Sequence, residues 1–257
     1  MSVFNHYARY YDLLYRDKDY AGEARFVHEQ LGKHGAAAGR LLELGCGTGR
    51  HAVEFAKLGW SVDGVDLSQA MVAQAQERAR QQPPEIISRL QFQQGDVRSA
   101  DTGQVYDAAI SLFHVMSYQT TNADLTAAFA TAARHLRPGG LFLFDFWYGP
   151  AVLTNRPTVR IKRIEDEYIT VTRLAEPELC PNRNEVTVNY QVFVRDKATE
   201  EYSEVKESHK IRYLFMPELE FLLSRCGLTV VRSSSWCSEE PLSDGTWYGC
   251  LVSQKIA

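Results

Sequence analysis

The chain has 257 residues, of which 45% are hydrophobic and 23% are charged, values that are ordinary for a globular protein. This length corresponds to one or two domains and can bury a full core without disulfides or metals. The 28 basic and 32 acidic residues give a net charge of -4, which argues against a nucleic-acid partner and against a polybasic membrane anchor.

Five scattered cysteines without a C-x-x-C pair favour reduced thiols and a cytoplasmic protein. No apolar run approaches the ~20 residues of a membrane span. The first residues lack the basic and apolar pattern of a signal peptide. No set of His, Cys, Asp and Glu has metal-ligand spacing, so no metal is expected.

Residues 40–146 alternate between short apolar runs and longer amphipathic patterns, which predicts strands separated by helices. Strands are expected at 40–45, 61–66, 90–94, 106–113 and 141–144. Helices are expected at 50–58, from Ser68 to Pro83, and at 121–137. After an interruption, a helix at 217–226 and strands near 228–232 and 248–253 follow. Strands that alternate with helices indicate a parallel sheet with right-handed crossovers.

The interruption, residues 157–215, has a hydrophobic period of two. Apolar side chains such as Val186 and Val188 alternate there with polar ones, as in a half-buried strand. The pattern predicts an antiparallel sheet of three or four strands. We therefore expect one α/β domain, residues 1–156 plus 216–257, with an antiparallel β cap inserted in it.

A glycine-rich turn follows the first predicted strand, with the sequence Glu43-Leu-Gly-Cys-Gly-Thr-Gly49. Glycines at alternate positions allow a tight turn and a close approach of a ligand to the backbone. A dinucleotide fingerprint has the spacing G-x-G-x-x-G, whereas this turn is G-x-G-x-G followed by Arg50. The spacing therefore disfavours a nicotinamide dinucleotide as the ligand. Taken alone, the turn could also be an ordinary connection between a strand and a helix that binds no ligand.

The next two predicted strands end in carboxylates. Asp66 lies at the distance beyond the glycine turn that suits an acceptor for both ribose hydroxyls, with helix capping as its alternative. Asp96 and the backbone of Val97 can bind an exocyclic amine and a ring nitrogen, unless Asp96 is only a turn residue. Met71 lies one helical turn beyond Asp66 and either covers an adenine face or joins the core. Ligands of open α/β sheets bind beyond the carboxyl ends of the strands, so these ends predict one site.

Taken in order, these motifs resemble those of the class I S-adenosylmethionine-dependent methyltransferases. The series consists of residues 43–49, 65–68 and 95–97, followed by Leu136-Arg-Pro-Gly-Gly140. The resemblance implies an α/β, Rossmann-like fold: a seven-stranded, mostly parallel sheet whose last strand is antiparallel, with the antiparallel β insertion after strand five. It also implies S-adenosyl-L-methionine as the cofactor.

The resemblance carries roles onto individual residues. Gly45 to Gly49 would pass beside the methionine part of the cofactor, Asp66 would hold the ribose, and Asp96 with Val97 would read the adenine. The residues expected to bind the cofactor are Tyr7, Tyr15, Tyr20, Glu43, Gly45, Cys46, Gly47, Gly49, Asp66, Leu67, Met71, Gly95, Asp96, Val97 and Leu112.

The tyrosine-rich stretch 7–20 resembles the N-terminal lid of amino-sugar N-methyltransferases from deoxysugar biosynthesis, as does Ser111-Leu-Phe-His-Val-Met-Ser-Tyr118. This implies a lid over residues 1–36, a small sugar-like or amine acceptor, and a homodimer. His114 departs from the pattern, because a small polar residue is expected at its position.

Two residues are predicted to be catalytic. His114 lies just past strand four on the ligand side of the sheet, where a neutral imidazole can take a proton from an ammonium or a hydroxyl; a structural role is the alternative. The resemblance places Tyr15 at the reacting centre, and tyrosine faces attract cations such as a sulfonium. His209 is less favoured, because Ile211 and Phe215 share its strand face and indicate packing.

Several large aromatic residues lie near predicted strand ends. They could form a rim that stacks on a sugar ring, or they could be core or a subunit contact. These residues are Trp147, Tyr148, Trp236, Trp247 and Tyr248.

The sequence thus predicts a methyltransferase that acts on a small polar molecule, most specifically on the amine of an amino sugar. One alternative is an O-methyltransferase acting on a sugar or secondary-metabolite hydroxyl. Another is a non-catalytic subunit that binds S-adenosylmethionine.

Overall fold

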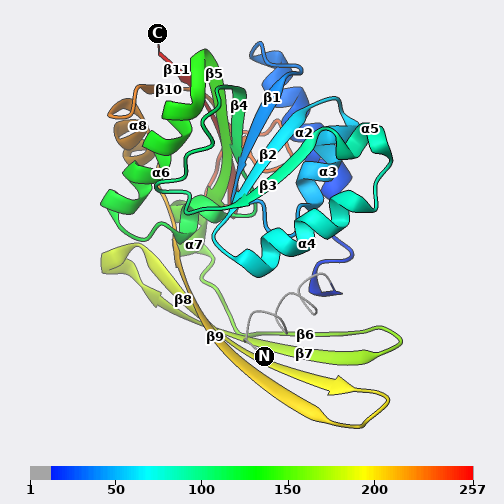
Figure 1. Cartoon of the computed structure of the whole chain (residues 1–257). Coiled ribbons are helices and arrows are strands. Elements are labelled where there is room, and N and C mark those ends of the chain that lie inside the picture. The colour runs from blue at the N-terminus through cyan, green and yellow to red at the C-terminus, as the bar shows by residue number, and fades with distance from the viewer. Residues whose placement is uncertain (1–12, 257) are drawn as a thin grey trace.

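Two β-sheets form the frame of the protein, which the computed structural model describes over residues 13–256 (Figure 1). The larger sheet contains β1 (Arg40–Leu44), β2 (Ser61–Asp66), β3 (Leu90–Gln94), β4 (Tyr106–Ser111), β5 (Leu136–Trp147), β10 (Leu228–Ser235) and β11 (Tyr248–Lys255). The smaller sheet contains β6 (Arg160–Glu165), β7 (Ile169–Cys180), β8 (Glu185–Asp196) and β9 (Tyr202–Arg212). The α-helices are α2 (Tyr20–Lys33), α3 (Arg50–Lys57), α4 (Gln69–Arg80), α5 (Pro84–Ile87), α6 (Asn122–His135), α7 (Gly149–Thr154) and α8 (Met216–Ser224). Two 3₁₀ turns are η1 (Val115–Tyr118) and η2 (Pro181–Arg183).

The larger sheet has the strand order β10-β11-β5-β4-β1-β2-β3. β1 pairs in parallel with β2 on one side and with β4 on the other, so the strand order reverses at β1. β11 lies antiparallel to both of its neighbours, β5 and β10. The expected seven-stranded, mostly parallel sheet with an antiparallel last strand is therefore confirmed.

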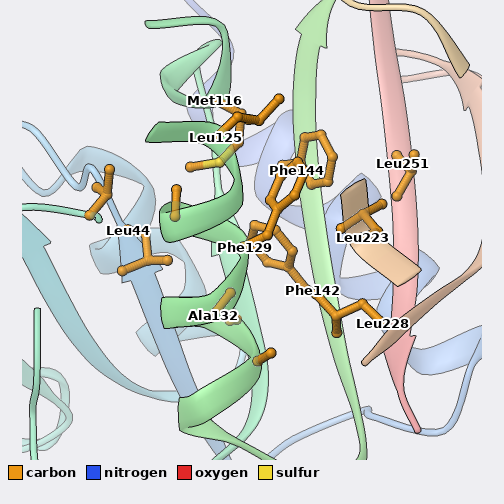
Figure 2. Close-up of a cluster of buried hydrophobic side chains, with 14 of the residues drawn as sticks. Leu44, Met116, Leu125, Phe129, Ala132, Phe142, Phe144, Leu223, Leu228 and Leu251 are labelled. Atoms are coloured by element: carbon orange, nitrogen blue, oxygen red, sulfur yellow. The ribbon is translucent and has the colours of Figure 1, made fainter. Parts of the chain in front are cut away.

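One face of this sheet is covered by α6 and α8. β5 supplies Phe142 and Phe144 to this face, where they pack against Phe129 of α6 with ring centroids 6.1 and 5.4 Å apart. Figure 2 shows these rings in one cluster with Leu223 of α8 and Leu251 of β11, which lie on the same side of them. The alternate residues of β5 point the other way because successive strand side chains face opposite sides.

The opposite face is covered by α2 and α3 (Figure 1). Leu141 and Leu143 of β5 lie here, buried with Phe55 of α3 and Val27 of α2. β5 is thus apolar on both faces, as expected for a strand in the interior of a covered parallel sheet. Within residues 13–256, no helix combines the length and hydrophobicity needed to cross a bilayer.

β5 is longer than the predicted strand at 141–144, since it begins at Leu136. Leu136 pairs with Tyr106 of β4, and the register shifts before Ala108 pairs with Leu141. Pro138 lacks an N–H and cannot continue α6, but it tolerates an extended backbone at such an irregularity. β5 therefore begins directly after α6 ends at His135, a few residues before the strand start that the sequence predicts.

The smaller sheet is inserted between α7 and α8, and its four strands form an antiparallel meander in the order β6-β7-β8-β9. The predicted insertion of three or four antiparallel strands is confirmed. Leu13 and Leu14 pack against Ile169 and Val171 of this sheet, so the start of the described chain contacts the smaller sheet. The sheet is also joined to the larger one by a second cluster, in which Val186 and Val188 of β8 pack with Val152 of α7, Tyr213 and the partly buried Trp147 of β5.

Replacement of Phe129 by alanine should destabilise the protein by about 3–5 kcal/mol, because it removes a fully buried ring that packs against both Phe142 and Phe144. Urea unfolding measures this change. Phe221→Ala on α8 is the matched control, since 62% of that side chain is exposed, and it should stay within about 0.5 kcal/mol of the parent. Equal effects of the two substitutions would contradict the proposed packing.

Candidate active site

A cavity of about 880 Å³ lies between the larger sheet and the inner face of the smaller one. The turn after β1, the ends of β2 and β4, and η1 line it from the larger sheet. Strands β7, β8 and β9 line it from the other side with residues such as Arg173, Tyr190 and His209. The inserted sheet therefore acts as a cap over the carboxyl ends of the parallel strands.

Most of the residues predicted to bind a cofactor meet in this cavity. The predicted residues that line it are Tyr15, Tyr20, Gly45, Cys46, Gly47, Asp66, Leu67, Met71, Asp96, Val97, Leu112 and His114. Glu43, Gly49 and Gly95 are not among the lining residues and lie behind it. Tyr7 falls outside the described part of the chain.

The glycine turn has positive φ angles at Gly45, Gly47 and Gly49, with values of 83°, 53° and 73°. A Cβ at Gly45 would lie 2.6 Å from a methyl of Val115, whereas one at Gly47 would meet nothing within 4 Å. Gly47 is therefore where a ligand can approach the backbone. A Cβ at Gly49 would lie 2.9 Å from that of Ala75, so this glycine serves the packing of α3 on α4.

Asp66 is held by two backbone donors at the end of β2. The N–H of Gly47 donates to Oδ2 at 2.8 Å, and the N–H of Ser68 donates to Oδ1 at 2.9 Å. Burial raises the pKa of Asp66, and these two hydrogen bonds oppose that rise. The side chain that caps α4 is Ser68, whose Oγ accepts from the N–H of Met71 at 3.4 Å. Asp66 is therefore a fixed pair of acceptors that faces the cavity.

Asp96 is held by Arg98, a partner that the motif reading did not include. The guanidinium donates to both carboxylate oxygens, with Nε 3.0 and 3.1 Å from them, and Nη1 also reaches Asp124 at 2.7 Å. These hydrogen bonds hold the pKa of Asp96 below its usual value. Asp96 is therefore an oriented, ionised acceptor beside Val97.

Glu43 lies behind the glycine turn and is almost fully buried, with 1% of its surface accessible. Burial, followed by the charge of Asp66, raises its pKa well above the usual value. Its Oε2 has no hydrogen-bond partner among residues 13–256. The nearest cation-forming group is His51, whose Nδ1 lies 4.0 Å from Oε1. A positive group near the turn would favour the ionised form of this carboxyl.

His51 links the turn to the first described helix. Its Nε2 lies 2.8 Å from Oε2 of Glu23 on α2, and its ring meets that of Tyr20 edge-on at 4.8 Å. Lys18 pairs with Glu23 on the other side. Burial alone would raise the pKa of Glu23, but His51 and Lys18 outweigh it and hold that pKa below its usual value. The predicted lid is thereby tied by charged groups to the start of α3, directly after the glycine turn.

His114 lies just beyond β4 in a strained stretch of backbone. Phe113 and His114 have consecutive positive φ angles of 65° and 64°, a conformation that costs on the order of 1–3 kcal/mol for each non-glycine residue. The N–H of His114 donates to Oδ1 of Asp145 at 3.0 Å. Its Nδ1 lies 2.6 Å from Oδ2, an ion-pair distance without hydrogen-bond alignment. The ring also stacks on Tyr248 at 4.5 Å.

Tyr15 reaches the cavity from the start of the described chain. Its ring meets Phe113 edge-on at 4.9 Å, and its hydroxyl accepts a hydrogen bond from Nη1 of Arg173 at 3.1 Å. The two residues predicted to be catalytic, Tyr15 and His114, are therefore brought together through Phe113. The contact between Tyr15 and Arg173 could not be predicted from motifs, because the two residues lie 158 positions apart in the sequence.

Three of the predicted rim aromatics, Trp147, Trp247 and Tyr248, line the cavity. Tyr148 packs against the cluster of Figure 2, and Trp236 packs edge-on to Phe26 at 5.7 Å. Sequence reasoning missed the cap side of the cavity, where His209 was read as packing. It lines the cavity together with Glu207 and with Tyr118 of η1. The alternation of β9 already placed Glu207 and His209 on one face, which is the signal that could have found them.

Known proteins resemble this chain along most of its length. Residues 41–140 match the family model described as a methyltransferase domain. Over 226 residues the chain is 30% identical to a dTDP-3-amino-3,4,6-trideoxy-alpha-D-glucopyranose N,N-dimethyltransferase of Streptomyces venezuelae, covering 87% of this chain and 90% of the relative.

Two solved structures have the same fold along their length. An S-adenosylmethionine-dependent methyltransferase from Clostridium acetobutylicum superposes with a TM-score of 0.82 at 22% identity, covering all of both chains. Streptomyces venezuelae DesVI superposes with a TM-score of 0.80 at 26% identity, covering 98% of each chain. The chain therefore belongs to the S-adenosylmethionine-dependent methyltransferases, within which it is similar to the amino-sugar N-methyltransferases.

Proposed function

We propose that this protein transfers a methyl group from S-adenosylmethionine to the amine of an amino sugar. The observation that carries the proposal is the single cavity that joins the glycine turn to the cap. One end has the acceptors Asp66 and Asp96, and the other end has a polar and aromatic cap wall. The Streptomyces venezuelae relative is named for N,N-dimethylation of a dTDP-linked amino sugar, and it aligns with the cap as well as the core.

The residues present suit the cofactor. Asp66 offers two oriented acceptors to a ribose, and Asp96 offers one to an exocyclic amine. The open backbone at Gly47 gives room for a ligand beside the turn. When bound, the cofactor supplies a methyl group on a positively charged sulfur. The tyrosine faces near the cavity, including Tyr15 and Tyr20, suit such a cation.

The cap also carries positive charge that suits an anionic acceptor. Arg160 and Lys162, at alternate positions of β6, line the cavity together with Arg173 of β7. The Lys162 ammonium donates to the carbonyl of Leu14, so this cation also orders the start of the described chain. Guanidinium and ammonium groups bind phosphate oxygens, which supports a nucleotide-linked sugar as the acceptor.

We propose His114 and Tyr15 as the residues that contact the reacting groups. Asp145 and Tyr248 hold the His114 ring on two sides, and Arg173 holds the Tyr15 hydroxyl. Such fixed side chains can align an acceptor nitrogen opposite the sulfur, and orientation alone contributes about 7–11 kcal/mol in favourable intramolecular models. The role of His114 as a proton acceptor stays a prediction.

The organisation around the site completes the proposal. Residues 1–36 would serve as a lid and 157–215 as a cap on a domain formed by 1–156 and 216–257. We further propose that the enzyme is cytoplasmic, that its acceptor is a small molecule and not a nucleic acid, and that it does not bind a membrane. All five cysteines are free thiols, which supports a reducing compartment. A homodimer rests on the resemblance to amino-sugar enzymes alone.

Incubation of the purified protein with S-adenosylmethionine and dTDP-3-amino-3,4,6-trideoxy-α-D-glucopyranose should give a product that is heavier by one or two methyl groups, measured by mass spectrometry. The amine should be the methylated atom. The matched control is the same sugar with a hydroxyl in place of the amine. Methylation of that control alone would favour an O-methyltransferase, and cofactor binding without any product would favour a non-catalytic subunit.

Asp66→Asn should weaken S-adenosylmethionine binding by about 10- to 100-fold, because an amide offers one acceptor oxygen where the carboxylate offers two and lacks its charge. Isothermal titration calorimetry measures the dissociation constant. Asp244→Asn, at an exposed position away from the cavity, is the control and should leave it unchanged. Unchanged binding in Asp66→Asn would remove this residue from the cofactor site.

His114→Ala should lower kcat by about 100-fold, because the ring helps to align the acceptor nitrogen opposite the sulfur. The dissociation constant of S-adenosylmethionine should change by no more than about twofold, since the ring lies at the reacting end of the cavity. Steady-state kinetics and calorimetry separate the two effects. A normal turnover number would show that His114 is structural.

A further inference from the structure

A chain of three polar side chains crosses the cavity wall between the core and the cap. The hydroxyl of Tyr118, on η1, lies 2.9 Å from Nδ1 of His209 on β9. On the other side of the ring, Nε2 of His209 lies 3.1 Å from Oε2 of Glu207. All three residues line the cavity. The chain therefore begins at a hydroxyl on the core side and ends at a carboxylate on the cap.

The chemistry of the three groups fixes the direction of their hydrogen bonds. An ionised carboxylate only accepts, so the Nε2 of His209 carries the hydrogen and donates it to Glu207. In a neutral imidazole the other nitrogen is then an acceptor, so the Tyr118 hydroxyl donates to Nδ1. This is the arrangement in which a hydroxyl can pass its proton to an imidazole whose positive form a carboxylate stabilises.

The groups around His209 hold it in this position. The ring of Tyr190, on β8, meets it edge-on at 5.1 Å, and the guanidinium of Arg173, on β7, lies 4.9 Å from the centre of the Tyr190 ring. Burial of the hydroxyl end, followed by the neighbouring Tyr190 and Tyr15, raises the pKa of Tyr118. Tyr118 as a whole is 47% accessible. With its pKa raised, its hydroxyl is protonated at neutral pH.

His209 and Glu207 also have a route to solvent. The side chains are 22% and 15% accessible, so they are neither sealed in the core nor fully hydrated. A proton that reaches the imidazole can therefore be released to water in contact with these side chains. The three groups thus form a path for a proton from the hydroxyl of Tyr118 to water.

We propose that Tyr118, His209 and Glu207 form a proton relay that removes a proton from the ammonium group of the acceptor. This inference rests on the proposed amine methylation. Tyr118 is assigned as the catalytic residue, because it lines the cavity and its hydroxyl stands at the core end of the chain. His209 and Glu207 are positioning residues that act through it.

The relay works in a defined order. The hydroxyl oxygen of Tyr118 accepts one proton from the acceptor ammonium while its own proton moves to Nδ1 of His209, which leaves a neutral amine and an imidazolium paired with Glu207. The amine lone pair then forms the N–C bond to the methyl, and the C–S bond breaks with its electron pair left on sulfur. The imidazolium finally releases the proton to water, and Tyr118 is unchanged.

The test compares Tyr118→Phe, His209→Gln and Glu207→Gln with the parent enzyme, using S-adenosylmethionine and dTDP-3-amino-3,4,6-trideoxy-α-D-glucopyranose. At neutral pH, kcat should fall by about 100-fold in the first two variants. The loss should shrink as the pH rises towards the pKa of the acceptor ammonium, because the sugar then arrives as a neutral amine. Binding of S-adenosylmethionine, measured by calorimetry, should be unchanged. Glu240→Gln, at an exposed carboxylate outside the cavity, is the control.

A second measurement does not depend on turnover. In the nuclear magnetic resonance titration of labelled histidines, the pKa of His209 should fall in Glu207→Gln, because the imidazolium loses its negative partner. A loss of kcat that is the same at every pH, or an unmoved His209 titration, would overturn the relay. The same pH-dependent rescue in His114→Ala, with none in His209→Gln, would assign the proton to His114 instead.

Failure of the relay is distinct from failure of the proposed function. If the parent enzyme does not methylate this amine, the acceptor assignment is wrong, and the histidine titration still reports whether the hydrogen-bond chain exists. If the parent methylates the amine and all three variants keep its rate, only the relay is wrong.

Discussion

The site depends on a clamp between the ends of β1 and β2. The N–H groups of Gly45 and Cys46 both donate to the carbonyl of Val65, at 2.7 and 3.0 Å, and that of Gly47 donates to Asp66. These bonds force three consecutive residues to curl around the end of the neighbouring strand. Positive φ at Gly45 and Gly47 is the conformational consequence, and it leaves the backbone open to the cavity. Asp66, Ser68 and α4 are then placed by the same clamp.

The larger sheet was readable from the sequence because its signals are local. Each strand–helix unit carries its own apolar period, and residues such as Ser68 and Pro83 mark helix ends within a few positions. The carboxyl ends of the strands then follow from the parallel topology alone. For the same reason Asp66 and Asp96 could be placed at one edge without knowledge of any side-chain contact.

The cap wall could not be read in this way. Tyr118 and His209 are separated by 91 positions and meet only because β9 passes η1. The alternation of side chains along β9 correctly placed Glu207, His209 and Ile211 on one face of the strand. It could not show whether that face packs against other residues or lines a cavity. Arg98 was missed for a different reason: its contact with Asp96 is local, yet any surface arginine has the same appearance in a sequence.

The antiparallel placement of β11 bears on how the chain folds. β10 joins the sheet only through β11, because β11 lies between it and β5. During synthesis, β10 therefore has no strand in this sheet to pair with until β11 has emerged. Tyr248, which stacks on His114, belongs to that same final strand. The wall of the cavity that includes Tyr248 is thus complete only after β11 has been made and has paired with β5, so residues separated by more than 130 positions must come together before the cavity closes.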